Sequence, residues 1–571
     1  MKKNFSVLGL NYGGHDSSAA IIVNGKLIAA CEEERFSREK HSRGFPVEAI
    51  EECLKQAGLK INDVNEIALS HDPEAYIREF YLERAIESLD NIQFLFDDRD
   101  RISKQLSLLK DISQRMNYQG LMQSYRHHQC HLASAYYPSG LDDCLVVSND
   151  GIGEVSSGAL GLGVNGQLEF LSEGPKFPHS LGLLYSAVTW YLGWKHHCDE
   201  GIIMGLASFG NPYEHASNGK SYVKNFQDII NYDGQESYKL NLSWIEFHRK
   251  RNTWVSNHFV NVFGAKRNPD EPVLERHKNI AAALQLVLEE TVMGTFRHWR
   301  DKYRMSNLCI AGGVGLNCSL NGKILKAELF DKVYVQPAAG DAGCAIGACL
   351  LASERAGIVF EREYTGQSNY LGYEADDDEI ETALKKSSLP INKVSNVAVK
   401  VAELLESGKI VGWFQGRAEF GPRALGNRSI LCKPYPQSMR DYINSRVKFR
   451  EEFRPFAPAV LSKYADQYFE IKQKSPHMLY AVQAKSNLKT KIEATVHIDN
   501  SCRVQTVDEA GNKKFADLLE EFYRITEVPV LLNTSFNIKG MPVVNNAFDA
   551  VDCFCRTNID VLVIGDYIVE K

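Results

Sequence analysis

The chain has 571 residues, 44% of them apolar and 24% charged, with a formal net charge of −7. Its length allows two or more domains with substantial cores, its composition is typical of a globular protein, and its acidic balance gives no sign of bulk nucleic-acid binding. There are 13 cysteines but no Cys-x-x-Cys pair. This favours a reducing compartment over a disulfide framework or a cysteine zinc site.

The first residues begin like a secretory signal, because residues 5–10 are largely apolar. The polar segment from Asn11 to Ser18 interrupts that apolar run at once, so we expect no signal peptide here. No apolar run approaches the length of a membrane span. We therefore expect a cytoplasmic protein without a membrane partner.

The first half of the chain contains one pattern twice. Strands are expected over 5–10, 19–23 and 26–31 and again over 144–148, 159–164 and 167–171, and each set includes an Asn-Gly turn. Two apolar runs joined by Asn-Gly strongly predict a hairpin. An amphipathic helix is expected over 47–57 and charged helices over about 73–120. Such a duplication resembles the actin, sugar-kinase and heat-shock-ATPase (ASKHA) architecture, whose two α/β halves each offer a hairpin to nucleotide phosphates.

Four side chains suggest a metal site. His127 and His131 lie one helical turn apart, which allows both imidazoles to hold one ion. Asp150 follows the strand at 144–148, and Asp341 follows a second strand at 333–335. Two His and two Asp suit a transition metal with mixed nitrogen and oxygen ligands. The alternative is that these are ordinary surface or core histidines.

A long apolar helix over 279–299 is expected to lie between the two halves. The strand at 308–311 then leads into Gly312 and Gly313, with Asn317 close behind. Such a glycine pair lets the backbone approach a ligand, here a nucleotide, although tight packing of a strand on a helix gives the same pattern. We expect the first domain to span 1–357 and an acidic linker to span 358–395.

The second domain, expected over 396–571, is rich in arginine. A strand at 409–414 precedes the first of these residues, and a strand at 528–532 ends at Asn533. The cations are interleaved with Gly, Pro and aromatic residues, which favours a phosphate pocket over a solvated basic face. The candidate phosphate ligands are Arg417, Arg423, Lys448, Arg450, Arg454 and Arg503.

Together these segments resemble the NodU/CmcH/TobZ-type O-carbamoyltransferases, which modify hydroxyl groups of sugars and natural products. The matching motifs span nearly the whole chain in family order: residues 15–19, 32–36, 40–41, 127–131, 204–207, 311–317, 416–428, 453–458 and 532–537. Phe420 departs from the pattern, since relatives often carry tryptophan there. The zinc cysteine pairs of hydrogenase-maturation relatives are missing, which argues against that branch.

The resemblance implies an actin-like first domain, similar to tRNA threonylcarbamoyl-transfer proteins, and a YrdC-like α/β second domain. The second domain would convert carbamoyl phosphate and ATP, with Mg, to carbamoyl-adenylate. The first would pass the carbamoyl group to a hydroxyl of a small-molecule acceptor. A metal, expected to be Fe(II), would be held by His127, His131, Asp150 and Asp341. Asn533 would orient the carbamoyl amide, and a homodimer is allowed.

An alcohol acceptor must lose its proton in the transition state. His15 is the candidate base, although a hydrogen-bonding role in the core is an alternative. Asp199 or Glu200 could bind or deprotonate the acceptor. Lys40 could assist at the phosphates, or it could be a surface lysine. Residues about 170–270 could line the acceptor pocket, among them His179, Trp190, Trp194, His196 and His197.

Three other functions compete with this interpretation. An actin-like small-molecule kinase has no use for an arginine-rich second domain. A tRNA-modification protein would need an RNA-binding face, which the acidic balance does not offer. A zinc hydrolase usually places a catalytic Glu beside the first ligand His, and position 128 is His instead.

Overall fold

A computed structural model describes residues 5–360 and 369–571. The first half of the actin-like part is a five-stranded sheet in the order β3-β2-β1-β4-β5, in which β1 pairs antiparallel with β2 and parallel with β4. The strands are β1 (Ser6–Asn11), β2 (Ser18–Val23), β3 (Lys26–Glu32), β4 (Glu66–Leu69) and β5 (Leu121–Ser124). Two short helices follow the hairpin, α1 (Glu33–Ser37) and α2 (Val47–Ala57).

The second half repeats this sheet. Its order is β12-β11-β6-β7-β8, so β6 takes the place of β1, and it pairs antiparallel with β7 and parallel with β11. The strands are β6 (Cys144–Asn149), β7 (Gly158–Val164), β8 (Gln167–Glu173), β11 (Asn307–Ala311) and β12 (Lys332–Val335). The predicted duplication and the actin-like architecture are therefore confirmed.

The two hairpin turns are built alike. Asn24 and Gly25 have φ of 52° and 82°, and Asn165 and Gly166 have φ of 52° and 81°. Positive φ at both central positions is the geometry that a tight turn between twisted strands requires, and Asn-Gly adopts it at the lowest cost. The sequence signal for both hairpins was correct.

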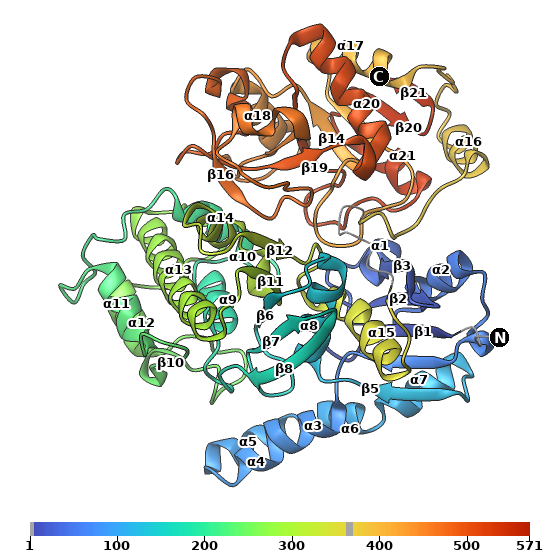
Figure 1. Cartoon of the computed structure of the whole chain (residues 1–571). Helices are drawn as coiled ribbons and strands as arrows, with labels where there is room; N and C mark the ends of the chain where they lie inside the picture. Colours follow the sequence, from blue (N-terminus) through green and yellow to red (C-terminus); the bar gives the residue numbers. More distant parts are fainter. Residues whose placement is uncertain (1–4, 361–368) are drawn as a thin grey trace.

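Two helices separate the sheets, α8 (His127–Ser139) and α15 (Cys344–Arg355) (Figure 1). They can approach closely because Gly347 has no Cβ. A Cβ at this position would collide with the backbone carbonyl of Cys130. The long helix expected at 279–299 exists as α13 (Glu275–Tyr303), but its expected position was wrong. It packs on α10 and α11 within the second half, because its buried face is filled by that half's aliphatic and aromatic core.

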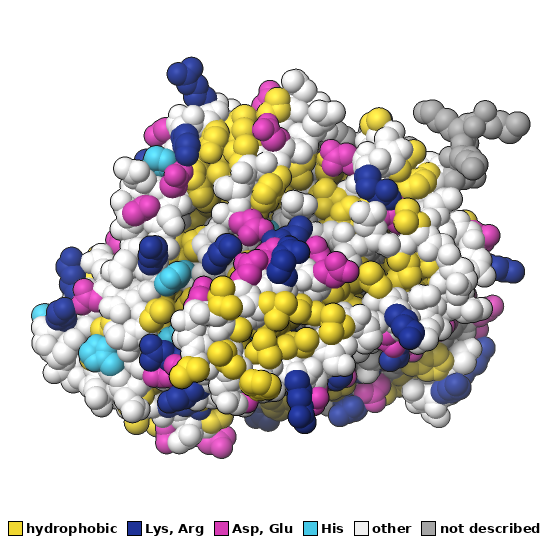
Figure 2. All heavy atoms as spheres, turned by 90° about the horizontal axis from the view of Figure 1, so that it is seen from below, with side chains coloured by type: hydrophobic (Ala, Val, Ile, Leu, Met, Phe, Trp, Pro, Cys, Tyr) yellow, Lys and Arg dark blue, Asp and Glu magenta, His cyan; other side chains and the backbone are white. Residues whose placement is uncertain are grey.

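The remaining elements of this part surround the two sheets. They are α3 (Pro73–Tyr76), α4 (Glu83–Ala85), α5 (Leu89–Asp97), α6 (Arg99–Leu106), α7 (Leu108–Met116), α9 (Leu181–Tyr191), α10 (Glu200–Ala207), α11 (Tyr222–Ile229), β9 (Ile230–Tyr232), β10 (Tyr238–Leu240), α12 (Asn257–Phe263) and α14 (Cys318–Lys326). The charged helices expected over 73–120 are confirmed. They form an arm whose exposed apolar side chains include Ile86, Leu89 and Phe96. Figure 2 views the molecule from below and shows apolar patches among charged groups.

The second part is an α/β domain around a seven-stranded sheet in the order β18-β15-β19-β14-β13-β20-β21 (Figure 1). The strands are β13 (Val411–Phe414), β14 (Arg428–Cys432), β15 (Ala457–Leu461), β18 (Gln505–Val507), β19 (Val530–Ser535), β20 (Val561–Ile564) and β21 (Tyr567–Glu570). Helices α17 (Val397–Glu406) and α20 (Glu509–Thr526) cover one face, and α21 (Ala547–Arg556) lies on the other. A separate ribbon joins β16 (Ala481–Gln483) to β17 (Ser501–Arg503), and the short helices are α18 (Ser438–Tyr442) and α19 (Ala465–Tyr468).

The segment expected to be a linker at 358–395 contains a helix, α16 (Asp377–Lys386). Its acidic start is largely exposed, as expected, but Ile380, Ala383 and Leu384 are buried with α21 in the core of the second domain. The apolar spacing within the charged run builds this packed helix. The division at 357 and 396 stays a prediction, and part of the expected linker lies outside the described residues. No helix among the described residues is long and apolar enough to span a membrane.

Helix α1 joins the two parts. Arg35 donates to the carbonyl of Gly421 over 2.6 Å, and Arg38 donates to the carbonyl of Val543 over 2.6 Å. In the opposite direction the Gly421 N–H lies 3.3 Å from Oε2 of Glu32. Charge-assisted hydrogen bonds of this kind are stronger than neutral ones. The acidic and basic run after β3 is therefore a contact surface between the domains.

Glu33 gives this contact region a pH dependence. Its side chain is 6% exposed and accepts the Ala49 N–H over 2.9 Å, and burial raises the pKa of its carboxyl from 4.5 to about 7. Between these values the folded protein keeps a proton that the unfolded chain releases. Stability therefore falls as the pH rises from 4.5 to about 7, by up to about 3 kcal/mol.

We expect Glu33→Gln to match the wild type in thermal midpoint near pH 5 and to exceed it near pH 8, because glutamine is never ionised. Thermal unfolding across this range measures the difference. Glu32, whose pKa burial also raises to about 7, keeps part of the slope in the variant. An identical slope in both proteins would show that Glu33 does not titrate in this window.

Candidate functional site

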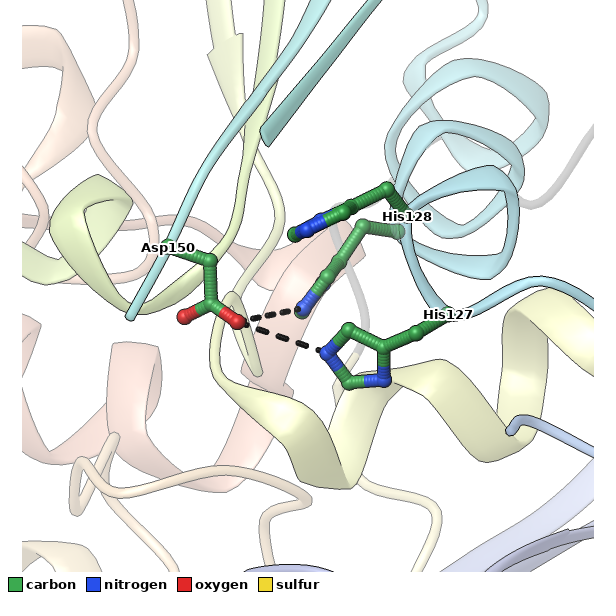
Figure 3. A group of neighbouring side chains, drawn as sticks. His127, His128 and Asp150 are labelled. Atoms are coloured by element: carbon green, nitrogen blue, oxygen red, sulfur yellow. Dashed lines mark hydrogen bonds and ion pairs between the residues drawn. The ribbon is translucent and has the colours of Figure 1, made fainter. Parts of the chain in front are cut away.

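The four predicted metal ligands lie together at the junction of the two halves. Helix α8 presents His127 and His131 from successive turns, and Asp150 follows the end of β6. Figure 3 shows the carboxylate of Asp150 facing the ring of His127. Nε2 of His127 lies 3.3 Å from Oδ2 of Asp150 and 3.6 Å from Oδ1 of Asp341. Nε2 of His131 lies 3.6 Å and 3.9 Å from the same two oxygens. Two imidazole nitrogens and two carboxylate oxygens thus converge on one point.

The residues present fit a metal ion. His131 is fully buried, and neither of its ring nitrogens has a hydrogen-bond partner among the described residues. An orphaned buried imidazole is costly unless something else binds it. Most of the contacts between the imidazoles and the carboxylates are too long for good hydrogen bonds but suit neighbouring ligands of one ion.

The charges around this point also favour a cation. Burial alone would raise the pKa of Asp150, but His127 and His131 outweigh it and hold the pKa well below its usual range. Burial would lower the pKa of His127, yet the charges and contacts of Asp341 and Asp150 raise it well above its usual value. Two carboxylates facing two imidazoles form a donor set that suits a divalent ion of borderline softness.

Asp150 is held from behind by the glycine pair. The Gly313 N–H donates to Oδ1 of Asp150 over 2.8 Å, which leaves Oδ2 facing the imidazoles. Gly312 has a φ of +86°, and a Cβ there would meet the carbonyl of Asn149. Gly312 and Gly313, which were predicted to approach a nucleotide, therefore lie against Asp150. The hydrogen bond from Gly313 orients this candidate metal ligand.

Asn317, predicted as a nucleotide ligand, has its side chain already paired. Its Oδ1 accepts the Leu320 N–H over 3.0 Å as the cap of α14, and its amide exchanges hydrogen bonds of 3.0 Å with Gln285. A side-chain oxygen in this position satisfies a free N–H of the first helical turn. Its place in the fold is that of a helix cap.

Two buried residues beside the four candidate metal ligands were not predicted from the sequence. Nδ1 of His128 lies 3.2 Å from the Ser148 hydroxyl, and Nε2 lies 2.8 Å from the carbonyl of Ser156. Because both ring nitrogens are satisfied, His128 is not a free ligand although it lies beside the others. Glu154 accepts the His127 N–H over 3.0 Å and so fixes the start of α8. A lone acid in a Gly/Ser-rich loop was the available signal.

His15 lies in a second group of titratable side chains. Its Nδ1 is 3.0 Å from Oδ2 of Asp16, whose Oδ1 is 2.7 Å from Nδ1 of His41. The rings of His15 and His41 are 5.0 Å apart. Burial would lower the pKa of His15, but Asp16 and the charge of Asp341 raise it. Asp341 is therefore close enough to His15 to influence its charge.

The two acidic candidates before α10 have local partners. Oδ2 of Asp199 accepts the Lys195 N–H over 3.1 Å. Oε1 of Glu200 accepts the Ser186 hydroxyl and the His197 N–H, each over 2.6 Å. The His197 ring lies 6.0 Å from that of His15. Glu200 therefore holds His197 next to His15.

Other candidates for the acceptor region are more scattered. Lys40, adjacent to His41 in the chain, is partly buried. His196 packs on Trp254, whose ring is 4.4 Å away. Trp194 instead faces the second domain, where its Nε1 donates to Glu451 over 3.2 Å. The structure therefore groups His196 and His197 with His15, and it places Trp194 at the contact between the domains.

Five of the six predicted phosphate ligands form one cationic cluster in the second domain. They are Arg423, Lys448, Arg450, Arg454 and Arg503. Burial first, and then the neighbouring cations, lower the pKa of Arg423 to about 9 and that of Arg503. Glu451 reaches Arg454 over 3.7 Å, so the cluster keeps an excess of positive charge. Buried like charges destabilise the fold unless an anion binds them.

The sixth cation, Arg417, lies elsewhere. Its guanidinium donates to the carbonyls of Leu371 over 2.6 Å and Ile28 over 3.0 Å, and to the side chain of Gln56. Backbone carbonyls at the contact between the domains thus take up its donors. The expectation that Arg417 shares the phosphate pocket does not agree with this position.

Asn533 completes the cluster with an unpaired acceptor. Its Nδ2 donates to Gln505 over 2.9 Å and to the carbonyl of Ala424, next to Arg423, over 3.3 Å. Its Oδ1 is buried and has no hydrogen-bond partner among the described residues. Lys448 donates to Oδ1 of Asn537 over 2.7 Å, at the loop after β19. A free amide oxygen on the strand that Lys448 contacts, next to the segment of Arg423, suits a ligand with both an N–H group and phosphate.

The cationic cluster faces the first domain. Cys318, at the start of α14, lies near enough to affect the pKa of both Arg423 and Arg503. Its Sγ is 4.0 Å from the Met204 sulfur on α10, the helix that follows His197. Helix α14 also packs on β16 of the second domain. Helices α10 and α14 of the first domain therefore border the cationic cluster.

Fold and sites together define an actin-like protein joined to a second α/β domain, with a His/Asp group in one and a cationic cluster in the other. Two family models match the chain, Carbamoyltransferase N-terminus over residues 6–350 and Carbamoyltransferase C-terminus over residues 402–571. The chain belongs to the carbamoyltransferase family and is an enzyme of that class.

Relatives cover most of its length. An uncharacterised protein of Synechocystis sp. is 36% identical over 99% of this chain and 96% of its own. Nodulation protein NolNO of Sinorhizobium fredii is 36% identical over 98% of this chain and 79% of its own. Nodulation protein U of Rhizobium tropici is 29% identical over 92% and 90%. Among solved structures, HypF of T. kodakarensis aligns with 14% identity and a TM-score of 0.32 over 63% of this chain and 49% of HypF.

Proposed function

We propose that the chain is an ATP-dependent O-carbamoyltransferase that works in two steps at two sites. In the second domain, carbamoyl phosphate, ATP and one water give carbamoyl-adenylate, phosphate and pyrophosphate. In the first domain, a hydroxyl of a small natural product or sugar attacks the carbamoyl carbon and AMP leaves. The observation that carries the proposal is the cationic cluster with the free Asn533 Oδ1 beside it.

The first step follows from the charges of this cluster. Guanidinium forks match phosphate oxygens in pairs, so Arg423, Arg450 and Arg503 would bind the phosphates of ATP and carbamoyl phosphate. Mg would accompany ATP. Oδ1 of Asn533 would accept an N–H of the carbamoyl amide and so orient its carbonyl carbon. Fixed cations that meet developing negative charge need no reorganisation during the reaction.

The second step follows from the groups around His15. The mixed anhydride makes AMP a good leaving group, while the acceptor hydroxyl needs a base to take its proton. His15 would take that proton, with Asp16 orienting its ring through Nδ1. Glu200 would hold His197 against the same site, and Lys40 would lie at its edge. The proposed acceptor is a small molecule, and no nucleic acid or membrane is required.

His127, His131, Asp150 and Asp341 would hold the metal, for which we propose Fe(II) on the basis of the mixed imidazole and carboxylate donors. A divalent ion there would neutralise charge on the departing phosphate. The backbone of Gly313 and the carboxylate of Glu154 keep the donors in place from behind.

Product analysis without acceptor tests the proposal. The protein is incubated with ATP and carbamoyl phosphate, and pyrophosphate, AMP and ADP are measured. We expect pyrophosphate that depends on carbamoyl phosphate, because the cationic cluster activates the carbamoyl group through adenylation. ADP formed without carbamoyl phosphate would instead establish an actin-like kinase. The absence of any turnover would reject the adenylation step.

A further inference from the structure

A cavity of about 330 Å³ lies between the arm and loops of the second half, and none of its lining residues belongs to the two sites described above. The arm, which runs along the lower edge of the molecule in Figure 1, contributes a π-helical turn at Ile77–Leu82 and the start of α5. The loops contribute Val155, residues 176–178 and residues 248–249. A cavity of this size is at the lower end of the range for small-molecule sites, and π-helical turns are frequent at functional sites.

His248 lines this cavity with an imidazole that has no hydrogen bond. The residue is 8% exposed, and neither of its ring nitrogens has a hydrogen-bond partner among the described residues. Buried polar groups normally have partners, so a polar occupant of the cavity would account for this ring. Burial, and then the charges of Arg249 and Arg84, lower the pKa of His248 to about 4. The ring is therefore neutral near pH 7 and offers one N–H donor and one acceptor nitrogen.

We propose that this cavity binds an uncharged sugar or cyclitol ring, with His248 at its hydroxyl groups. A hydroxyl both donates and accepts, so neighbouring hydroxyls of such a ring match the two nitrogens of a neutral imidazole. The Ser88 hydroxyl, which accepts the Asn91 N–H over 3.2 Å, adds a donor to the same wall. Val155, which is buried, and Phe177, which is partly buried, supply apolar surface for the C–H groups of the ring.

The charges around the cavity favour an uncharged ligand. Glu79 is held by Arg126 through two hydrogen bonds of 2.8 Å, and the Arg84 guanidinium lies 4.6 Å from the centre of the Phe177 ring. The other charged groups are exposed, and both signs are present: Glu83, Glu87, Asp90, Lys176 and Arg249. With four carboxylates and three cations, the walls favour neither a phosphate nor a polyamine.

A metal ion is a poor alternative for this cavity. Two groups of His, Cys, Asp or Glu donors in the described chain are close enough to share an ion, one around His127 and one around His15. His248 belongs to neither of them. Its unpaired nitrogens therefore call for hydrogen-bonding groups rather than for coordination with neighbouring carboxylates.

The cavity adjoins the loop that supports the candidate metal ligands. Val155 follows Glu154, which accepts the His127 N–H over 3.0 Å. The Phe177 N–H donates to the carbonyl of Val155 over 2.7 Å and so ties two walls of the cavity together. A ring bound against Val155 and Phe177 is thus in contact with the segment that fixes the start of α8.

A row of aromatic rings leads from the cavity to the proposed transfer site. Phe247, the residue before His248, has its ring 6.0 Å from that of Trp254, and the Trp254 ring is 5.4 Å from that of His197. Two sources therefore fit the chemistry of the cavity: a sugar unit of the acceptor away from the reacting hydroxyl, or a free sugar. The binding itself does not depend on the proposed function, whereas the assignment to the acceptor rests on it.

Isothermal titration calorimetry of the full-length protein tests the proposal, with glucose, N-acetylglucosamine and myo-inositol as probes. We expect at least one of them to bind, and to raise the thermal midpoint by mass action on the folded state. Glucuronate, an anionic analogue of glucose, should bind more weakly than glucose. Binding by none of the three uncharged probes, or tighter binding of glucuronate, would overturn the proposed ligand class.

Three variants locate the bound ring. His248→Phe keeps the size of the side chain but removes its hydrogen bonds, and it should weaken binding by roughly 10-fold or more. Leu242→Trp should fill the cavity from another segment without removing a polar group. His258→Phe is the matched control, because His258 is exposed, packs on Trp244 at 4.2 Å and does not line the cavity. Unchanged binding in both His248→Phe and Leu242→Trp would overturn the site.

A reaction with the sugar that binds separates its two sources. The protein is incubated with that sugar, ATP and carbamoyl phosphate, and pyrophosphate and the mass of the sugar are measured. Carbamoylation that His248→Phe loses would identify the ring as part of the acceptor, and binding without carbamoylation would identify a separate small molecule. Sugar binding without any pyrophosphate would reject the proposed function and leave the sugar site standing.

Discussion

Replacing His131 by alanine is expected to remove the bound metal and lower carbamoyl transfer by at least roughly 100-fold, while pyrophosphate formation continues. His131 is fully buried and both of its ring nitrogens lack hydrogen-bond partners within the described chain, so a bound ion would account for its position. Metal content per chain, pyrophosphate release and product formation are measured on one preparation. Pyrophosphate formation shows that the second domain is still folded.

His128 provides a matched control, because it is a buried imidazole three residues before His131 on the same helix. Its ring nitrogens already lie within hydrogen-bond distance of Ser148 and Ser156. We expect His128→Asn to lower the thermal midpoint but to keep the metal. If His128→Asn lost the metal and His131→Ala kept it, the assigned ligand set would be wrong.

If His131→Ala and Arg454→Ala each lost both steps, the division into two sites would be wrong.

The features predicted well from the sequence are those set by local chemistry. Asn-Gly forces positive φ at both turn positions, so both hairpins could be located. The spacing of four residues places His127 and His131 on one face of a helix. Asp150 and Asp341 each follow the end of a strand, which brings their carboxylates close to the two histidines. Repetition of these elements predicts the duplicated sheet. Whether the four side chains bind metal stays a prediction, but their convergence follows from helix and strand geometry.

The features missed from the sequence depend on which partner occupies each side chain. Arg417 and Arg423 both belong to one Arg-rich segment. Arg417 donates to backbone carbonyls at the contact between the domains. Arg423 keeps a buried Nε that has no hydrogen-bond partner among the described residues. Asn317 caps a helix, which a lone Asn after glycines does not reveal. His15, His41 and His197 are far apart in the chain, and their rings come close only in the fold.

Arg503→Met is expected to abolish adenylate formation and at the same time to make the ligand-free protein more stable. Burial and the nearby charge of Arg454 lower the pKa of Arg503, so the folded protein without ligand carries an unfavourable, partly buried charge. Replacing it with an apolar side chain of similar length should raise the stability of the free protein by about 1–3 kcal/mol. Loss of a fixed cation at the phosphates should lower pyrophosphate release by roughly 100-fold or more.

The opposite signs of these two effects distinguish a ligand-binding arginine from a structural one. Removing a structural arginine lowers both stability and activity. Removing an arginine whose role is to bind an anion lowers activity but does not lower the stability of the free protein. Pyrophosphate should therefore raise the thermal midpoint of the wild type, by mass action on the folded state, and have little effect on the variant. Arg446, exposed in the same domain, supplies the control, since Arg446→Ala should change neither quantity. A destabilised Arg503→Met protein that still releases pyrophosphate at the wild-type rate would place the phosphates elsewhere.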